Sequence, residues 1–344
     1  MKKANEIDYG SIGFGYIQTP YNVRCYYRDG KWAEIETCTD ENLSIHIAAT
    51  SLHYGQECFE GLKAFRGVDG KVRLFRPTAN AERMQRTAQY LQMAVPDTEL
   101  FVKMCEMAVE LNIDYVPPME SNGSMYLRPL LIGTGAQVGV KPANEYLLVI
   151  FATPVGPYFK GGMCGINVMV DREHDRAAPR GTGHIKVGGN YGASLISSVE
   201  AHNKGFDSVL YLDPREHKYI DECGAANFFA IRGNSYITPA SRSILPSITN
   251  MSLKQLAADL GMEVEAREVE FSELTTFEEV GACGTAAVIT PIASIYDPQT
   301  DIKYEYKWVG EKSQKLYDLY RGIQLGSAPD THNWNMIIDE TSKN

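Results

Sequence analysis

The segment GTGHIKVGGNYGA, residues 181–193, could hold a reactive amine. Lys186 lies there between Ile185 and Val187 and has glycines on both sides. An apolar setting disfavours the charged amine, and glycines leave room for a bulky aldehyde beside the backbone, so the segment could carry a Schiff-base lysine. A surface lysine in a flexible loop explains the same residues about as well. A nucleotide phosphate loop is not indicated, because the G-x-x-x-x-G-K-[ST] pattern is absent.

Two further segments could bind a charged cofactor. Glu222 follows a short apolar run in YIDECGAANFF, where a carboxylate could keep a ring nitrogen protonated, although most glutamates at strand ends are simply solvated. In ILPSITNMS a turn leads into a helix, so the N–H groups of Ile248 and Thr249 could bind a phosphate. An ordinary helix N-cap explains this second segment as well.

Other kinds of site find less support. LLIGTGAQVG offers Gly133, Gly135 and Gly139, but the spacing is one residue too long and a strand rather than a helix should follow, so a dinucleotide fold is not supported. No metal-ligand spacing links the seven histidines, and no metal is expected. The seven cysteines contain no C-x-x-C pair, which argues against a disulfide framework or a zinc site.

Length and composition indicate a globular protein of two domains. The chain has 344 residues, of which 44% are apolar and 22% charged, and its net charge is −10. A negative protein is not expected to bind nucleic acid or anionic membranes non-specifically. MKKANEIDYG has no apolar stretch behind its lysines and no apolar run could span a bilayer, so we expect a cytoplasmic protein.

The elements that must position these residues alternate irregularly, which is typical of the α+β, or mixed α/β, class. Asp29-Gly30 and Asp69-Gly70 predict hairpin turns. Helices are expected near residues 78–91, 98–111, 191–203 and 249–260, with another around Leu316–Ile323; strands are expected at SMYLRPLLIG, EYLLVIFATP, INVMV, SVLYL, KYIDE, NFFAI and GACGTAAVIT. The Gly- and Pro-rich residues 154–165 predict a linker between a smaller domain, 1–153, and a larger one, 166–344.

Taken together, these segments resemble those of branched-chain amino acid aminotransferases, which are fold type IV pyridoxal-phosphate enzymes. The similarity extends from LHYGQECFEGLKAFR at residues 52–66 to GTAAVITPI at residues 284–292. Between them, in family order, stand RLFRPTANAERM, YLRPLLIGTG, PVGPYF, KVGGNYG and DECGAANFF. The resemblance implies that pyridoxal 5'-phosphate binds between the two domains.

The resemblance also implies the roles of individual residues. Lys186 would form the Schiff base and transfer the proton, and Glu222 would pair with the pyridine nitrogen. The remaining cofactor contacts would be Arg83, Tyr191, Ile248, Thr249 and Thr285. The substrate would contact Phe59, Tyr126, Arg128, Tyr158, Thr285 and Ala286, together with a Tyr54 contributed by a partner subunit. Ala225 departs from some members, which have a threonine there.

The implied function is ping-pong transamination between leucine, isoleucine or valine and 2-oxoglutarate, carried out by a homodimer. A D-amino acid aminotransferase and the 4-amino-4-deoxychorismate lyase of the same fold are the nearest alternatives. A non-catalytic protein that binds a dinucleotide through Gly133–Gly139 is an alternative of another class.

Overall fold

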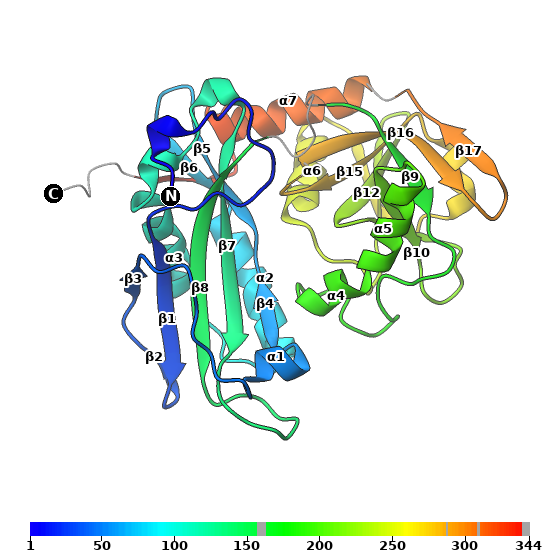
Figure 1. The fold of residues 1–344 in the computed structure, drawn as a ribbon. Helices are drawn as coiled ribbons and strands as arrows, with labels where there is room; N and C mark the ends of the chain where they lie inside the picture. Colours follow the sequence, from blue (N-terminus) through cyan, green and yellow to red (C-terminus); the bar gives the residue numbers. More distant parts are fainter. Residues whose placement is uncertain (157–162, 287, 308–309, 339–344) are drawn as a thin grey trace. The chain divides into compact units, whose positions relative to one another are not determined.

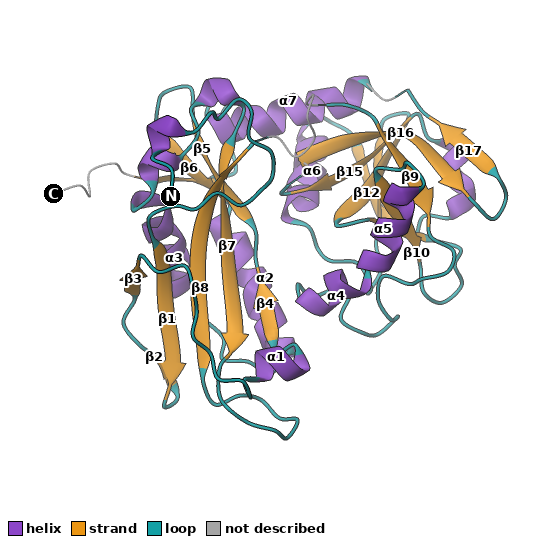
Figure 2. Ribbon diagram, viewed as in Figure 1, coloured by secondary structure: helices purple, strands orange, loops and turns teal. Residues whose placement is uncertain are grey.

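The computed structural model describes residues 1–156, 163–286, 288–307 and 310–338, and the chain divides into two compact units (Figure 1). Unit 1 comprises Met1–Tyr158, Lys186–Gly188 and Gly322–Asn344. Unit 2 comprises Phe159–Ile185 and Gly189–Arg321. Each unit combines a sheet with helices, in keeping with the mixed class expected from the sequence (Figure 2).

Unit 1 is built on an antiparallel sheet in which nine described strands take part. The order is β18-β6-β5-β7-β8-β1-β2, with β3 paired to β1 and β4 paired to β7. The strands are β1 (Asn22–Arg28), β2 (Lys31–Trp32), β3 (Glu36–Cys38), β4 (Glu57–Phe59), β5 (Leu62–Arg66), β6 (Val72–Phe75), β7 (Ser124–Gly133), β8 (Tyr146–Val155) and β18 (Asn335–Ile338).

Helices cover one face of this sheet and bury the core of unit 1 there. Met84 and Phe101, from the two longer helices, join Leu127 and Leu131 of β7 in one hydrophobic cluster. The helices are α1 (Thr50–Tyr54), α2 (Pro77–Tyr90) and α3 (Thr98–Glu110), with 3-10 turns at Ala4–Glu6, Ile113–Tyr115 and Met119–Ser121. Because neighbouring residues of a strand point to opposite faces, Tyr126 and Arg128 of β7 lie on the face away from α2 and α3.

Unit 2 contains a mixed sheet that closes on itself. Pairing runs β11-β10-β9-β16-β15-β12, and β12 pairs again with β11, so these six described strands form a barrel; β13 and β14 extend from β12, and β17 pairs with β16. The strands are β9 (Ile166–Val170), β10 (Ser208–Leu212), β11 (Ile220–Cys223), β12 (Ala226–Arg232), β13 (Ser235–Pro239), β14 (Glu263–Arg267), β15 (Glu279–Gly284), β16 (Val288–Asp297) and β17 (Ile302–Glu305).

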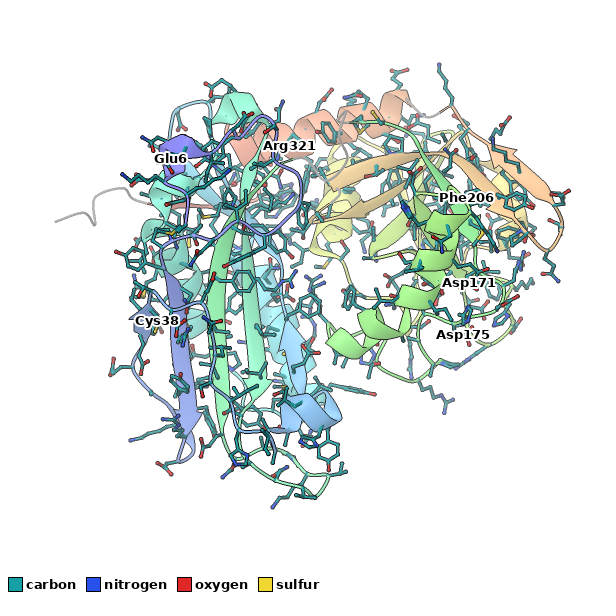
Figure 3. All side chains as sticks on the ribbon, viewed as in Figure 1. Glu6, Cys38, Asp171, Asp175, Phe206 and Arg321 are labelled. Atoms are coloured by element: carbon teal, nitrogen blue, oxygen red, sulfur yellow. The ribbon has the colours of Figure 1, made fainter. Side chains whose placement is uncertain are left out.

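Side chains from the barrel strands form the main core of unit 2, and a smaller cluster lies beside the barrel. In the smaller cluster the rings of Phe206 and Tyr296 stack with centroids 5.5 Å apart. Figure 3 labels Phe206 among the side chains of this unit. The accompanying helices are α4 (Gly188–Ala193), α5 (Leu195–Asn203), α6 (Ile248–Asp259), the 3-10 segment Phe271–Thr276 and α7 (Glu311–Leu325). The first residue of α4 and the part of α7 from Gly322 onward belong to unit 1.

Most predicted elements are confirmed, and the differences have local causes. Asp29 and Gly30 both have positive φ in the β1–β2 turn, as a two-residue hairpin requires. Asp97 caps α3 by accepting a hydrogen bond from the Leu100 N–H at 2.7 Å. α2 begins at Pro77, one residue before the predicted start, and the predicted helix 191–203 is two helices, α4 and α5.

Two predictions about strands and domains were wrong. GACGTAAVIT is not one strand: β15 ends at Gly284 and β16 begins at Val288. The end of the chain does not belong with the larger domain, because β18 pairs antiparallel with β6 and adds an edge strand to unit 1. Lys186–Gly188 also belongs to unit 1. Part of the predicted linker, residues 157–162, lies outside the described residues.

The helices that the structure describes include none that combines the length and the apolar character needed to cross a membrane.

Candidate active site

The strand register of unit 1 places three predicted substrate residues on one face of the sheet. Phe59 of β4 pairs with Leu130 of β7, and Tyr126 and Arg128 precede Leu130 at two-residue steps. Paired residues share a face of a sheet, as do residues two apart, so Phe59, Tyr126 and Arg128 lie side by side. Phe59 is far from Tyr126 and Arg128 in the sequence, and the pairing of β4 with β7 brings the three residues to one surface.

Arg128 rests on aromatic rings and keeps unused hydrogen-bonding capacity. Its guanidinium carbon lies 4.7 Å from the centroid of the Phe59 ring and 5.3 Å from that of Tyr126. One terminal nitrogen donates a hydrogen bond to the Tyr126 hydroxyl at 3.1 Å. Its Nε is buried without a hydrogen-bond partner, and no described carboxylate forms an ion pair with it. Such a cation can accept the carboxylate of a ligand.

The Lys186–Gly188 segment is held against unit 1 by three backbone hydrogen bonds. The Lys186 N–H donates to the Thr87 hydroxyl and the Lys186 carbonyl accepts from the Phe59 N–H, each at 3.2 Å. The Gly188 N–H donates to a carboxylate oxygen of Glu57. These contacts fix the backbone of the lysine, while its amine lies 4.7 Å from the centroid of the Phe59 ring. The lysine amine and the Arg128 guanidinium thus share one aromatic neighbour.

Arg83, the predicted phosphate ligand, is held in place by a buried carboxylate. Its side chain forms a two-point ion pair with Glu60, with Nε–Oε1 and Nη2–Oε2 distances of 2.7 Å. Asn80 donates to the same carboxylate at 2.8 Å. The pair fixes the orientation of the guanidinium and compensates its charge within unit 1. Three residues later on α2, Arg86 is exposed and has no ion-pair or hydrogen-bond partner among the described residues.

In unit 2, Glu222 is a buried carboxylate that is compensated by a cation. It lies on β11, accepts a hydrogen bond from the Leu245 N–H and forms an ion pair with Arg176 at 3.1 Å. The Arg176 guanidinium also donates to the carbonyl oxygens of Gly183, at 2.9 Å, and Ser243. Sequence reasoning missed Arg176, because nothing in DREHDRAAPR distinguishes it from the neighbouring charged residues.

We expect Arg176→Met to destabilise the apoprotein by roughly 3–5 kcal/mol, because the substitution leaves Glu222 buried without its cation. Urea unfolding without added cofactor measures this change free of any effect on cofactor binding. The double variant Arg176→Met with Glu222→Gln is the control and should recover part of the loss, because no uncompensated carboxylate remains. If Arg176→Met lowers the free energy of unfolding by less than about 1 kcal/mol, the Arg176–Glu222 pair contributes no more than an exposed ion pair does.

The beginning of α6 has the properties of an anion site. Ser247 is the N-cap, and its hydroxyl accepts a hydrogen bond from the Asn250 N–H at 3.2 Å. The cap does not bind the first two helical N–H groups, which are those of Ile248 and Thr249. Both residues are buried, and no described atom accepts a hydrogen bond from either N–H group. Buried N–H groups at a helix N-terminus need an external acceptor, and a phosphate oxygen is a suitable one.

The other predicted residues take varied positions. Tyr191 lies in α4, and Thr285 and Ala286 form the turn after β15, all of them partly buried. Tyr54 ends α1, is 41% exposed and donates from its hydroxyl to the Val138 carbonyl. Tyr158 lies outside the described residues. Among the described residues, no cluster of histidine, cysteine or carboxylate side chains could hold a metal ion.

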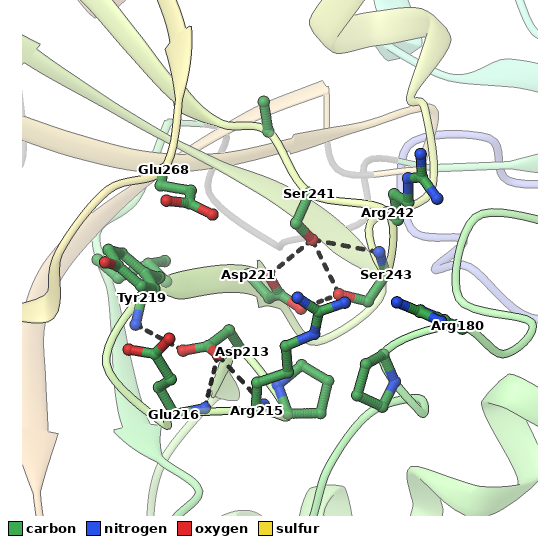
Figure 4. A pocket seen from close by; sticks show the side chains of 14 residues that line it. Arg180, Asp213, Arg215, Glu216, Tyr219, Asp221, Ser241, Arg242, Ser243 and Glu268 are labelled. Carbon is green, nitrogen blue, oxygen red and sulfur yellow. Dashed lines mark hydrogen bonds between the residues drawn. The ribbon is translucent and has the colours of Figure 1, made fainter.

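Unit 2 also contains a pocket of about 520 Å³ that none of the predicted site residues lines (Figure 4). Its wall includes Asp221, whose carboxylate accepts from the hydroxyls of Ser241 at 3.0 Å and Ser243 at 2.6 Å. Burial raises the pKa of this carboxyl group. Because Asp221 and Glu222 are neighbours on β11, their side chains point to opposite faces. The pocket therefore lies on the other side of the strand from Glu222.

Sequence comparisons identify relatives along almost the whole chain. A model of the amino-transferase class IV family matches residues 57–295. The branched-chain-amino-acid aminotransferase of Haemophilus influenzae is 48% identical over an alignment of 349 positions, which covers 97% of this chain and 99% of that protein. The enzyme of the same name from Helicobacter pylori is 44% identical over 337 residues, covering 97% and 98%.

Solved structures agree with these relatives. The branched-chain amino acid aminotransferase of Escherichia coli matches with a TM-score of 0.80 at 25% identity, covering 94% of this chain and all of that one. The branched-chain aminotransferase of the archaeon Thermoproteus uzoniensis, solved with norvaline, matches with a TM-score of 0.75 at 26% identity, with 92% and 99% covered. The expected fold class is confirmed by these matches.

Proposed function

Because the chain belongs to the amino-transferase class IV family, we propose that it transfers amino groups between branched-chain L-amino acids and 2-oxoglutarate, with pyridoxal 5'-phosphate as cofactor. The relatives that match along its length are named as branched-chain amino acid aminotransferases. Their names do not favour the two alternatives, a D-amino acid aminotransferase and the 4-amino-4-deoxychorismate lyase. The dinucleotide-binding alternative also fails, because β8 follows Gly133–Gly139 where that fold requires a helix.

A single observation carries the proposal: the Lys186 amine and the Arg128 guanidinium lie over the same Phe59 ring. An aromatic surface suits the side chains of leucine, isoleucine and valine. The Arg128 guanidinium over the Phe59 ring can bind the second carboxylate of glutamate or 2-oxoglutarate. One surface can therefore serve both kinds of substrate in a ping-pong reaction, and no separate pocket is required for each.

The donor groups of each unit fit the proposed cofactor. When bound, pyridoxal 5'-phosphate supplies an aldehyde that condenses with amines and a ring that accepts the electrons of a carbanion. In unit 2, the N–H groups of Ile248 and Thr249 would bind phosphate oxygens, and Glu222 would keep the ring nitrogen protonated. The ion pair with Arg176 holds Glu222 in place and compensates its negative charge even when no cofactor is bound.

Lys186 would perform the proton transfer. Its amine can take the proton from the substrate Cα and deliver it to the aldehyde carbon of the cofactor, C4', which receives the amino group. The hydrogen bonds to Thr87, Phe59 and Glu57 hold the backbone of the segment, so that only the side chain of the lysine needs to move during this transfer. Tyr191, Thr285 and Ala286 would complete the cofactor and carboxylate contacts.

A panel of amino donors of both chiralities, each with 2-oxoglutarate as acceptor, tests this function. L-Leucine, L-isoleucine and L-valine should each give L-glutamate and the matching 2-oxo acid, and D-alanine should give neither. A preference for D-donors would instead support the D-amino acid alternative. Release of pyruvate from 4-amino-4-deoxychorismate without an acceptor would support the lyase.

Arg83 is the proposed phosphate arginine of unit 1, and its pair with Glu60 would hold the guanidinium ready for the cofactor. Arg83→Met should weaken cofactor binding roughly 10- to 100-fold, the value of a hydrogen bond to a charged group. It should also destabilise the apoprotein by roughly 3–5 kcal/mol, because Glu60 is left buried without its cation. Cofactor titration and urea unfolding of the apoprotein measure the two effects.

A double variant and a control separate the two roles of Arg83. Arg83→Met with Glu60→Gln should recover part of the stability, because no uncompensated carboxylate remains, but not the affinity for the cofactor. Arg86→Met, at the exposed arginine of the same helix, should change neither quantity. Normal cofactor affinity in the double variant would show that Arg83 serves only the core of unit 1.

A cytoplasmic homodimer is the remaining part of the proposal. In unit 1, Ile47, Val138 and Val140 are more than 80% exposed, and in unit 2 Leu195, Ile196 and Val199 of α5 are more than 50% exposed. Exposed apolar side chains that gather in this way support a contact with another chain. The exposed Tyr54 lies next to Val138, as expected for a residue that serves a partner subunit.

Sedimentation tests the assembly. The wild-type chain should sediment as a dimer or a larger oligomer, and Leu195→Asp together with Val199→Asp should shift it toward monomer with loss of activity, because two charges would be buried in the contact. Lys303→Ala, at an exposed ion pair with Glu305 on β17 of the same unit, is the control. A fully active wild-type monomer would contradict the proposal.

A further inference from the structure

Glu57 is an acidic side chain on the face that carries the proposed substrate residues. It precedes Phe59 by two residues on β4 and pairs with Ile132 of β7, so it shares the face of Phe59 and Arg128. The same Phe59 ring contacts the guanidinium of Arg128 and the amine of Lys186, each at 4.7 Å from its centroid. A carboxylate therefore lies beside the two cations of the proposed site.

The surroundings of Glu57 leave its charge only partly compensated. Its one described hydrogen bond comes from the Gly188 N–H, and it is too far from Arg128 to form an ion pair. Burial raises the pKa of the Glu57 carboxyl, whereas the Gly188 N–H and the positive charge of Arg128 lower it. Because Glu57 and Arg128 share a face of the sheet without forming an ion pair, their charges lie near each other without direct contact.

We propose that Glu57 is a specificity-determining residue, which weakens the binding of acidic substrates at Arg128 and so favours apolar ones. The inference rests on the proposed function, in which Arg128 accepts the side-chain carboxylate of glutamate and 2-oxoglutarate. A substrate carboxylate at Arg128 is attracted by the guanidinium and repelled by Glu57, because like charges in a partly buried site are weakly screened. A leucine side chain carries no charge and is unaffected by this repulsion.

A purely structural role does not account for the charge of Glu57. A neutral amide oxygen could also accept the Gly188 N–H, with a weaker hydrogen bond than a carboxylate forms, so holding the Lys186 segment does not require a negative charge. Partial burial of a carboxylate without a cation in contact has a cost in free energy that an amide would avoid. The charge itself therefore has a role that the hydrogen bond does not supply.

Glu57→Gln tests the charge, because it preserves the size of the side chain and the acceptor for Gly188. The half-reactions with L-glutamate and L-leucine should be measured separately. We expect the apparent dissociation constant for glutamate to fall about 3- to 10-fold, as for removal of one like charge at intermediate distance, and that for leucine to change less than about twofold. Glu145→Gln, at an exposed ion pair with Arg28 in the same unit, is the control and should change neither.

A second variant shows whether the effect acts through Arg128. In the Arg128→Met background, Glu57→Gln should increase the affinity for glutamate less than it does in the wild-type protein, because the cation that binds the glutamate side-chain carboxylate is missing. Equal changes for glutamate and leucine, or weaker glutamate binding in Glu57→Gln, would overturn the inference and leave Glu57 as an anchor of the Lys186 segment. If the wild-type protein converts leucine but the Glu57 variants show no change in glutamate affinity, only the inference about Glu57 is refuted. If the wild-type protein converts no branched-chain donor, the proposed function is refuted.

Discussion

Lys186→Ala is expected to abolish transamination while the chain stays folded. The amine is the group on the Phe59 surface that can both bind an aldehyde and move a proton. Loss of a positioned acid–base group costs roughly 10²–10⁴-fold in rate, and loss of the covalent attachment adds to this. The backbone contacts of the segment come from N–H and C=O groups, so alanine retains them.

Single-turnover rates with leucine, together with the visible absorption band of the bound cofactor, measure this effect. The band should no longer be that of a cofactor attached to lysine. Lys103→Ala, which removes a surface ion pair with Glu106 on α3, is the matched control and should leave both observables unchanged. Near-normal turnover of the Lys186 variant would rule out the assignment.

Arg128→Met is expected to separate the two kinds of substrate. Methionine retains apolar contact with Phe59 and Tyr126 but removes the cation that lies over their rings. A glutamate carboxylate would then be buried without a partner, at a cost of roughly 2–5 kcal/mol. Each 1.4 kcal/mol corresponds to about a tenfold change, so glutamate and 2-oxoglutarate should lose at least about 30-fold in affinity.

Leucine should lose much less, because its side chain uses only the apolar part of this surface. The two half-reactions must be measured separately, since a ping-pong cycle couples them. Arg128→Lys retains the charge but cannot offer a planar pair of donors, and we expect it to restore part of the glutamate reaction. If the rates of both half-reactions fall by the same factor in Arg128→Met, Arg128 has only a structural role and does not distinguish the two kinds of substrate.

Local features of the fold could be predicted because their causes are local. The Asp29-Gly30 turn follows from two residues that tolerate positive φ, and the start of α3 follows from the carboxylate of Asp97. Tyr126 and Arg128 share a face because strand geometry alternates, whatever surrounds the strand. The boundary at β15 and β16 was missed because GACGTAAVIT reads as one apolar run, and the turn inside it contains no proline and no asparagine.

The sequence by itself determined the family, the strand on which Tyr126 and Arg128 lie and the lysine that we expect to react, since these depend on neighbouring residues or on motifs in a given order. Only the tertiary structure decided which charges meet. Glu60 pairs with Arg83 from 23 positions away, Arg176 compensates Glu222, and Glu57 holds Gly188 across 131 positions. An arginine that a buried carboxylate holds and one that faces solvent look alike in a sequence, because the difference is a partner brought close by folding. That is why the partners of Arg83 and Glu222, and the place of Glu57 beside the proposed site, emerged only when the contacts were known.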